Sequence, residues 1–215
     1  MEFKNDMTWM YAMHTALRRE LERIARITER PDDDPKLVLR TAAGWEMFKS
    51  YLHVHHTTED DILWPPMRTA LPDGSDGLAL LDAMEAEHAG IDPLLSSIDA
   101  ALLDPESGPE RLGELTDALA TALRGHLDHE EAHGLPLIDS TVTEEQWLAF
   151  GVEHGKRVSA DIARYLPWIL DDATPEDTAK VLGLLPPPVQ QSYRDVWQPA
   201  YADLPLWDRQ RVADS

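Results

Sequence analysis

HHTTEDDILWPP, residues 55–66, and HLDHEEAHGLPLI, residues 126–138, are two copies of one pattern. In each copy a histidine precedes a glutamate by four residues, and a proline follows that glutamate by six. Residues four apart on an α-helix stack on one face, one turn apart. Each stretch therefore presents an imidazole and a carboxylate on the same helical face. The paired residues are His55 with Glu59 and His126 with Glu130, and the prolines are Pro65 and Pro136.

Both pairs stand where a helix that packs against a core normally carries leucine or isoleucine. Apolar residues recur at steps of three and four from Trp45 to Ile62 around the first pair, and a similar stripe from Leu112 leads into the second. Two further stripes contain one histidine each, His14 and His88. Burying an ionised carboxylate or an unpaired imidazole is costly. The six groups therefore need a shared partner, and a cation satisfies them all.

The candidate ligands are arranged as an internal repeat. Each half of the pattern supplies a single histidine and then a histidine–glutamate pair, and the intervals from the single histidine to the pair are 41 and 38 residues. A carboxylate has two oxygens and can bridge two metal ions. The repeat thus predicts two helical hairpins, related by an approximate two-fold axis, around a binuclear site. Its predicted ligands are His14, His55, Glu59, His88, His126 and Glu130.

Helical periodicity along the chain predicts an all-α fold. Four long segments, about 6–29, 36–64, 77–103 and 110–133, favour an antiparallel up-down four-helix bundle. We expect the breaks between them at proline or glycine. The expected breaks are PDDDP at 31–35, Pro65 with Pro66, and Gly134 with Pro136.

Additional helices are expected after the bundle. TVTEEQ, residues 141–146, contains helix-capping signals, and a fifth helix is predicted over about 144–170. Thr174 precedes a proline and two acidic residues, as at a helix start, and short helices should follow it. We therefore divide the chain into a bundle with a di-metal site, 1–140, and a C-terminal helical extension packed on it, 141–215.

Composition limits the function. A net charge of −21 argues against binding to nucleic acids or anionic membranes, because no basic patch is present. The absence of cysteine excludes disulfides, iron–sulfur clusters and thiolate zinc sites. No secretory signal or membrane-spanning run is evident, so we expect a soluble, cytoplasmic protein.

The two repeated stretches resemble the hemerythrin-like, or HHE cation-binding, domains, and the resemblance covers roughly residues 8–138. The part of the chain beyond it looks like the C-terminal helical extension of some bacterial proteins of this type. The resemblance implies an up-down four-helix bundle with two iron ions joined by an oxo (Fe–O–Fe) or hydroxo bridge. It matches the ligands helix by helix: His14, then His55 and Glu59, then His88, then His126 and Glu130. Manganese and zinc fit the same ligand types but are less favoured.

Oxygen-carrying hemerythrins have a further histidine four residues after the one on the third helix. Asp92 occupies that position here. This departure puts simple reversible oxygen carriage in doubt, because one iron would lose a nitrogen ligand. Four residues are candidates for additional ligands or for partners of the ligands: His56, Glu85, Asp92 and Glu131. His53 is expected to face outward, and His154 to lie in the core without binding metal.

Six protein ligands leave coordination positions open on two irons. The predicted small ligands are therefore O2, peroxide or nitric oxide, and the predicted function is an oxidase, oxygenase or peroxide-consuming activity, or storage and sensing of oxygen or iron. The identity of any organic substrate is left open. A first alternative is a metal-dependent iron or oxygen sensor that acts through its C-terminal tail.

A more remote alternative is a zinc hydrolase. His129, Glu130 and His133 spell H-E-x-x-H, in which two histidines bind zinc and the glutamate is the general base. This interpretation leaves the four ligands in the first three helices unexplained. We therefore rank it last.

Overall fold

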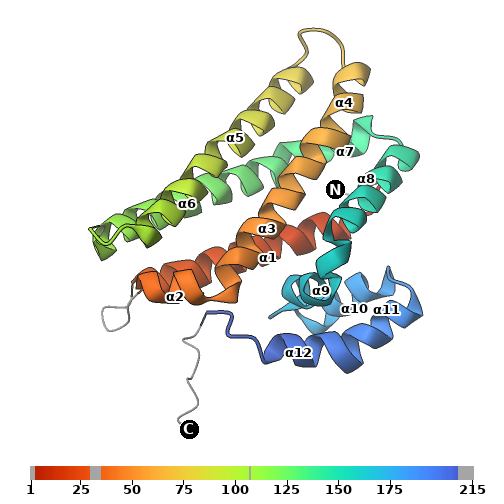
Figure 1. Ribbon diagram of the computed structural model, residues 1–215. Coiled ribbons are helices and arrows are strands. Elements are labelled where there is room, and N and C mark those ends of the chain that lie inside the picture. The colour runs from red at the N-terminus through yellow and green to blue at the C-terminus, as the bar shows by residue number, and fades with distance from the viewer. Residues whose placement is uncertain (1–2, 30–34, 107, 208–215) are drawn as a thin grey trace.

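The computed structural model describes residues 3–29, 35–106 and 108–207, and nearly all of them lie in helices or the turns between them. Four long helices run alternately up and down and pack as a bundle (Figure 1). The predicted all-α, antiparallel four-helix bundle with additional C-terminal helices is confirmed. The bundle helices are α1 (Thr8–Thr28), α3 (Ala43–Thr58), α5 (Asp76–Leu103) and α6 (Pro109–His129).

The prediction that prolines end the second and fourth helices is wrong. Each helix passes through one π-helical turn, η1 (Glu59–Leu63) or η2 (Glu130–Gly134), and then continues as α4 (Trp64–Ala70) or α7 (Leu135–Thr141). The N–H groups of Trp64 and Leu135 donate to the carbonyls of Glu59 and Glu130, five residues earlier. The prolines then fall in the first turn of a new α segment, where a missing N–H costs nothing.

Two other predicted helices are interrupted. Ala42, with an extended backbone, separates α2 (Pro35–Thr41) from α3. A 3₁₀ turn, η3 (Ser159–Asp161), divides the fifth helix into α8 (Glu144–Val158) and α9 (Ile162–Leu170). Most of the predicted break at 31–35 lies outside the described residues. The predicted caps are confirmed: Thr143 and Gln146 form a capping box on α8, and Thr174 accepts from the N–H of Asp177.

The core consists of two apolar clusters with a polar layer between them. The larger cluster contains Leu17 and Ile91, and the smaller one contains Met10 and Met84. His14 therefore lies between the two clusters on α1, as His88 does on α5. The smaller cluster is Met7, Met10, Leu63, Trp64, Met67, Leu81, Met84, Leu135, Ile138, Val142 and Phe150.

The C-terminal helices pack against α1 and α9 (Figure 1). They are α10 (Pro175–Gly183), α11 (Pro187–Ser192), η4 (Tyr193–Trp197) and α12 (Gln198–Ala202).

A buried carboxylate on α1 helps to attach this C-terminal part of the chain. Glu20, which is 0% exposed, accepts from Arg19, Arg23 and the indole of Trp207. Arg23 also pairs with Asp171 at 2.6 Å. The division of the chain at residue 140 stays a prediction.

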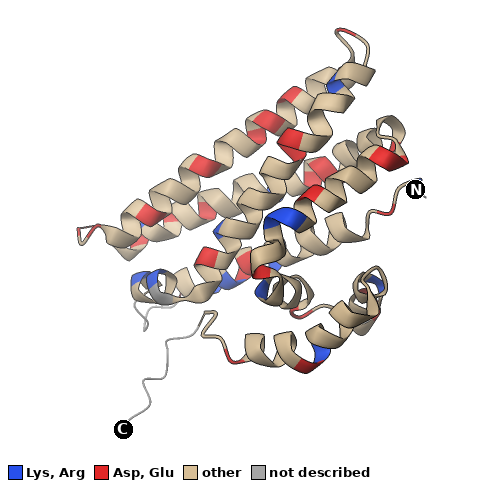
Figure 2. Ribbon diagram, turned by 45° about the vertical axis from the view of Figure 1, so that its right-hand side comes forward, with Lys and Arg blue, Asp and Glu red and all other residues tan. Residues whose placement is uncertain are grey.

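The surface is acidic, as Figure 2 shows along the bundle helices. The sequence of α5 contains six acidic residues and neither lysine nor arginine. Within the described residues, no helix is both long and apolar enough to cross a bilayer. Such a surface attracts cations rather than nucleic-acid phosphates.

Gly44 packs against the end of the described chain, and replacing it by alanine should destabilise the protein. A Cβ there would lie 2.4 Å from the Trp207 ring and 2.5 Å from the Leu206 carbonyl oxygen. We expect Gly44→Ala to lower the free energy of unfolding by about 1–3 kcal/mol in urea titrations. Gly113→Ala is the matched control, because no atom lies within 4 Å of its Cβ position, and it should be neutral or stabilising. Equal effects of the two changes would contradict this assignment.

Candidate metal centre

Five histidines and two glutamates meet in the polar layer. All are buried, with exposed fractions of 5% or less. Their potential ligand atoms form two triads, and within each triad all three atoms lie within 4.8 Å of one another. Each triad therefore has the composition and spacing of a metal site. One triad is His14, His55 and Glu130, and the other is His56, His88 and His126.

Glu59 and Glu130 each approach both triads. The Oε1 atom of Glu59 lies 3.4 Å from His55 Nδ1, and its Oε2 atom lies 3.6 Å from His88 Nε2. Glu130 Oε2 lies 3.1 Å from His14 Nε2 and 3.9 Å from His126 Nε2. The two carboxylates thus stand where each could bridge a pair of cations.

The centre also concentrates unsatisfied polar atoms. Among the described residues, nine buried side-chain nitrogen and oxygen atoms lack a hydrogen bond, and seven of them belong to this cluster. They are the Nε2 atoms of three histidines and all four carboxylate oxygens of the two glutamates. Native proteins rarely leave so many buried polar groups unpaired. The residues present therefore fit one or more bound cations. The histidines concerned are His14, His55 and His56.

Carboxylates on the outside of the cluster hold three of the imidazole rings. The Nδ1–H groups of His14, His88 and His126 donate to Glu131, Asp60 and Glu87 at 2.9, 2.8 and 2.9 Å. This pairing leaves the Nε2 lone pair of each ring for the centre. Glu131 was among the candidate partners from sequence, whereas Asp60 and Glu87 were missed. The repeat contained a signal for Asp60, because Asp60 and Glu131 directly follow the two paired glutamates.

The pKa values of the cluster depend on burial and on the neighbouring charges. Burial and the charge of Glu130 raise the pKa of Glu59 well above its usual range. Although burial opposes ionisation of Glu130, the charge of His14 lowers the pKa of that carboxyl. Burial also opposes the charge on His14, but Glu130 and Glu131 raise its pKa to about 8. Burial and neighbouring imidazoles lower the pKa values of His55 and His56 well below the ordinary value.

The two halves of the centre are not equivalent. In the repeat, His56 corresponds to Leu127, because each directly follows the paired histidine. Only one triad therefore gains a third imidazole. Similarly, Glu87 directly precedes His88, whereas Met13 precedes His14. An ion held by His14 and His55 would have fewer nitrogen ligands, and an open coordination position is expected on that side.

The structure brings all six ligands predicted from sequence together and adds His56 to them. It does not bring in Asp92 or Glu85, whose side chains are exposed, and Glu85 pairs with Arg68 at 2.9 Å. His56, from the neighbouring helix, stacks on His88 with ring centroids 3.9 Å apart, and the loss of a nitrogen ligand inferred from Asp92 stays a prediction.

Two other histidines lie outside the cluster. His53 is exposed. His154 belongs to neither triad, and burial together with Arg157 lowers its pKa to about 4.

The H-E-x-x-H residues do not form a zinc site with Glu130 as base. His129 donates to Glu87 at 2.8 Å, His133 is exposed, and Glu130 points into the buried cluster. The first residue of the motif, His129, ends α6, and the other four lie on the π turn η2. The hydrolase alternative has no support in this geometry.

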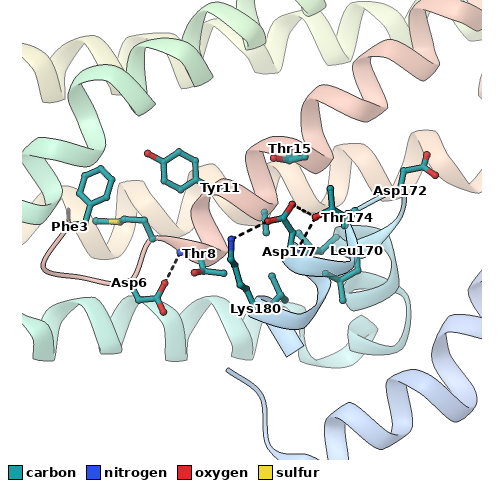
Figure 3. Close-up of a pocket in the computed structure, with 15 residues that line it drawn as sticks. Phe3, Asp6, Thr8, Tyr11, Thr15, Leu170, Asp172, Thr174, Asp177 and Lys180 are labelled. Atoms are coloured by element: carbon teal, nitrogen blue, oxygen red, sulfur yellow. Dashed lines mark hydrogen bonds and ion pairs between the residues drawn. The ribbon is translucent and has the colours of Figure 1, made fainter. Parts of the chain in front are cut away.

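A cavity of about 420 Å³ opens between the start of α1 and α9–α10 (Figure 3). Tyr11, Thr15 and Lys180 are among the residues that line it. Tyr11 lies one turn before His14, and the charge of Glu131 contributes, after burial, to raising the pKa of Tyr11. None of the five histidines or two glutamates of the centre is among the residues that line this cavity.

Fold and site together define a helical bundle whose core is built to hold metal cations. Residues 5–138, more than half of the chain, match the family described as the hemerythrin HHE cation binding domain. The chain belongs to this family. Comparisons with curated proteins and with solved structures found no significant match.

Gly134 leaves room for the Glu130 side chain, and filling that room should weaken metal binding. A Cβ at this position would lie 2.8 Å from Glu130 Cγ. We expect Gly134→Ala to displace the carboxylate and lower the metal content measured by elemental analysis, while circular dichroism still reports a helical fold. Gly125→Ala, which is next to His126 but has open space at its Cβ, should keep the wild-type metal content. If Gly134→Ala keeps it too, Glu130 is not held in this way.

Metal binding should release protons. At pH 7 His14, with its pKa of about 8, holds a proton that a cation must displace, and the raised pKa of Glu59 favours the protonated form of that carboxyl as well. We expect zinc, which is redox-silent, to release protons when it binds at pH 7, including the proton on His14. The affinity should increase with pH and level off above the pKa of His14. Calorimetry in buffers of different ionisation enthalpy measures this, and an affinity independent of pH would contradict it.

Proposed function

We propose that the chain is a non-haem di-iron protein that binds O2 or peroxide and reacts with it. The observation that carries this proposal is the pair of triads, each within reach of Glu59 and Glu130. Imidazole and carboxylate ligands without thiolate suit iron, and membership of the family favours it over manganese or zinc. Iron held there supplies interchange between the ferrous and ferric states and an open position for a small ligand such as O2, peroxide or nitric oxide.

The protein's own residues favour oxidation over reversible binding. The carboxylates of Glu131, Asp60 and Glu87 accept from ligand imidazoles and so make them more basic. Basic nitrogen donors and two buried anionic oxygen ligands stabilise the more highly charged ferric state. The apolar clusters on either side exclude bulk water from the centre. We therefore infer a site that is oxidised after it meets O2 or peroxide and does not revert when the oxidant is removed.

The test begins with stoichiometry. We expect about two irons per chain by elemental analysis, and near-ultraviolet absorbance of a bridged ferric pair after aerobic purification. Reduced protein mixed with O2 should become ferric within minutes and stay so under argon. A stable oxy spectrum that disappears on purging and returns on re-aeration, over several cycles, would falsify the reactive-site proposal and favour carriage or storage.

Substitution of a bridging candidate tests the ligand set. Glu59→Ala should lose iron and lower the thermal stability, because it leaves buried cationic charge without its anion. His53→Ala, on an exposed side chain of the same helix, should change neither quantity. Full iron content in Glu59→Ala would mean that this helix face is wrongly assigned.

A sensor that acts through its C-terminal helices is the second candidate. The observation that favours it is the contact between α9 and the residue before a ligand: the Tyr165 hydroxyl lies 4.0 Å from Met13 Sδ. If metal binding moves His14, it would also move Met13 and change the contact of Met13 with Tyr165 on α9. If iron binding leaves hydrogen exchange of α9–α12 unchanged, this candidate loses its support.

A further inference from the structure

Three aromatic side chains form a buried group under α3. Tyr51 lies on α3, whereas Tyr165 and Trp168 lie on α9, outside the segment that matches the family. The ring of Tyr51 meets those of Tyr165 and Trp168 edge-on, with centroids 4.9 and 5.0 Å apart. All three side chains are 3% exposed or less. Electrons pass readily between aromatic rings at such separations, so the group can act as one path.

This group adjoins the side of the metal centre that has fewer nitrogen ligands. Tyr51 precedes His55 by four residues on the same helix, so both side chains lie on one face. The Tyr165 hydroxyl contacts Met13, the residue before His14. The rings of Tyr165 and His154 are 5.7 Å apart. The path therefore ends beside the position expected to be open.

Only one member of the group has a proton acceptor. The Tyr51 hydroxyl donates to Asp161 Oδ2 at 2.5 Å. Among the described residues, Tyr165 has only the sulfur of Met13 as partner for its hydroxyl, and the buried Trp168 Nε1 has none. Loss of an electron from either of these would leave a cation in an apolar site, which is costly. Tyr51 can lose its proton together with the electron and become a neutral radical.

We propose that Tyr51 is a redox-active tyrosine that gives one electron to the metal centre during reduction of O2 and passes its phenolic proton to Asp161. The inference rests on the proposed function. Reduction of one O2 to two waters takes four electrons and four protons. Two ferrous ions in the site and one in solution supply three electrons, Tyr51 supplies the fourth, and solvent supplies the four protons. The products are three ferric ions, a neutral tyrosyl radical, protonated Asp161 and two waters.

The surroundings of Asp161 suit this role. Its side chain is 34% exposed, so a proton taken from Tyr51 can pass on to solvent. Arg164 holds the other carboxylate oxygen, with Nε 2.7 Å from Oδ1. Burial and the hydrogen bond to Asp161 raise the pKa of Tyr51, so the phenol is protonated at rest. The pair is therefore poised for coupled loss of an electron and a proton.

Electron paramagnetic resonance after rapid freezing tests the proposal. Wild-type protein is loaded anaerobically with a slight excess of ferrous ion over two per chain and mixed with O2. We expect a tyrosyl radical signal that narrows when the protein contains ring-deuterated tyrosine. Tyr51→Phe should lose the signal. Tyr201→Phe is the matched control, because Tyr201 is also buried and bonded to an aspartate, Asp171 at 3.3 Å, but lies on α12, and this variant should keep the signal.

A second variant separates the electron donor from a structural role. In Asp161→Asn the phenol remains but its proton acceptor is gone, so the radical should be lost while iron oxidation, followed by absorbance, still proceeds. A wild-type signal in Tyr51→Phe, or ferric iron without any tyrosyl radical in the wild type, overturns this inference alone. Iron that neither O2 nor peroxide oxidises overturns the proposed function and this inference together.

Discussion

Two carboxylates and five imidazoles buried in one layer of the bundle are the constraint on which the rest of the structure depends. An ionised carboxylate in an apolar core is very costly unless a cation or several hydrogen bonds compensate it. Here the hydrogen bonds are largely missing, since all four oxygens of Glu59 and Glu130 lack a partner. The outer carboxylates, the π turns and the room left by Gly134 are best understood as means of holding these groups toward one point.

The fold and the candidate ligands were largely predictable because they follow from helical periodicity. His14 and His88 lie within stripes that are otherwise apolar, and the stripes show which face of each helix is buried. The repeat also predicted how the two helices align, because the same spacing of histidine and glutamate in both places the two pairs at the same level along the bundle axis. The antiparallel order of the four bundle helices required nothing further.

The predictions failed where contacts between helices override the rules that hold within a single helix. Pro65 and Pro136 were expected to end helices, but a π turn before each moves the hydrogen-bond partners by one residue and lets the helix continue. We interpreted Asp92 from its position in the family's pattern, but its side chain lies on the solvent-exposed face of α5. His56 lies beside His55 in sequence, and only the packing of α3 against α5 shows that both can enter the cluster. Glu87 pairs across helices, which spacing along one helix does not reveal.

The division of the core into two apolar clusters has a consequence for cooperativity. The smaller cluster unites the start of α1 with α4, α7 and the start of α8, and it adjoins the larger cluster through the polar layer. Without a cation, seven buried polar atoms of that layer lack hydrogen bonds, so we expect the layer to stabilise the fold less than the apolar clusters do. The far end of the bundle can then open as a separate unit at lower free energy than global unfolding requires. A bound ion would have ligands on helices from both hairpins. It would therefore link the two apolar clusters across the polar layer, and the two partly independent units would unfold together.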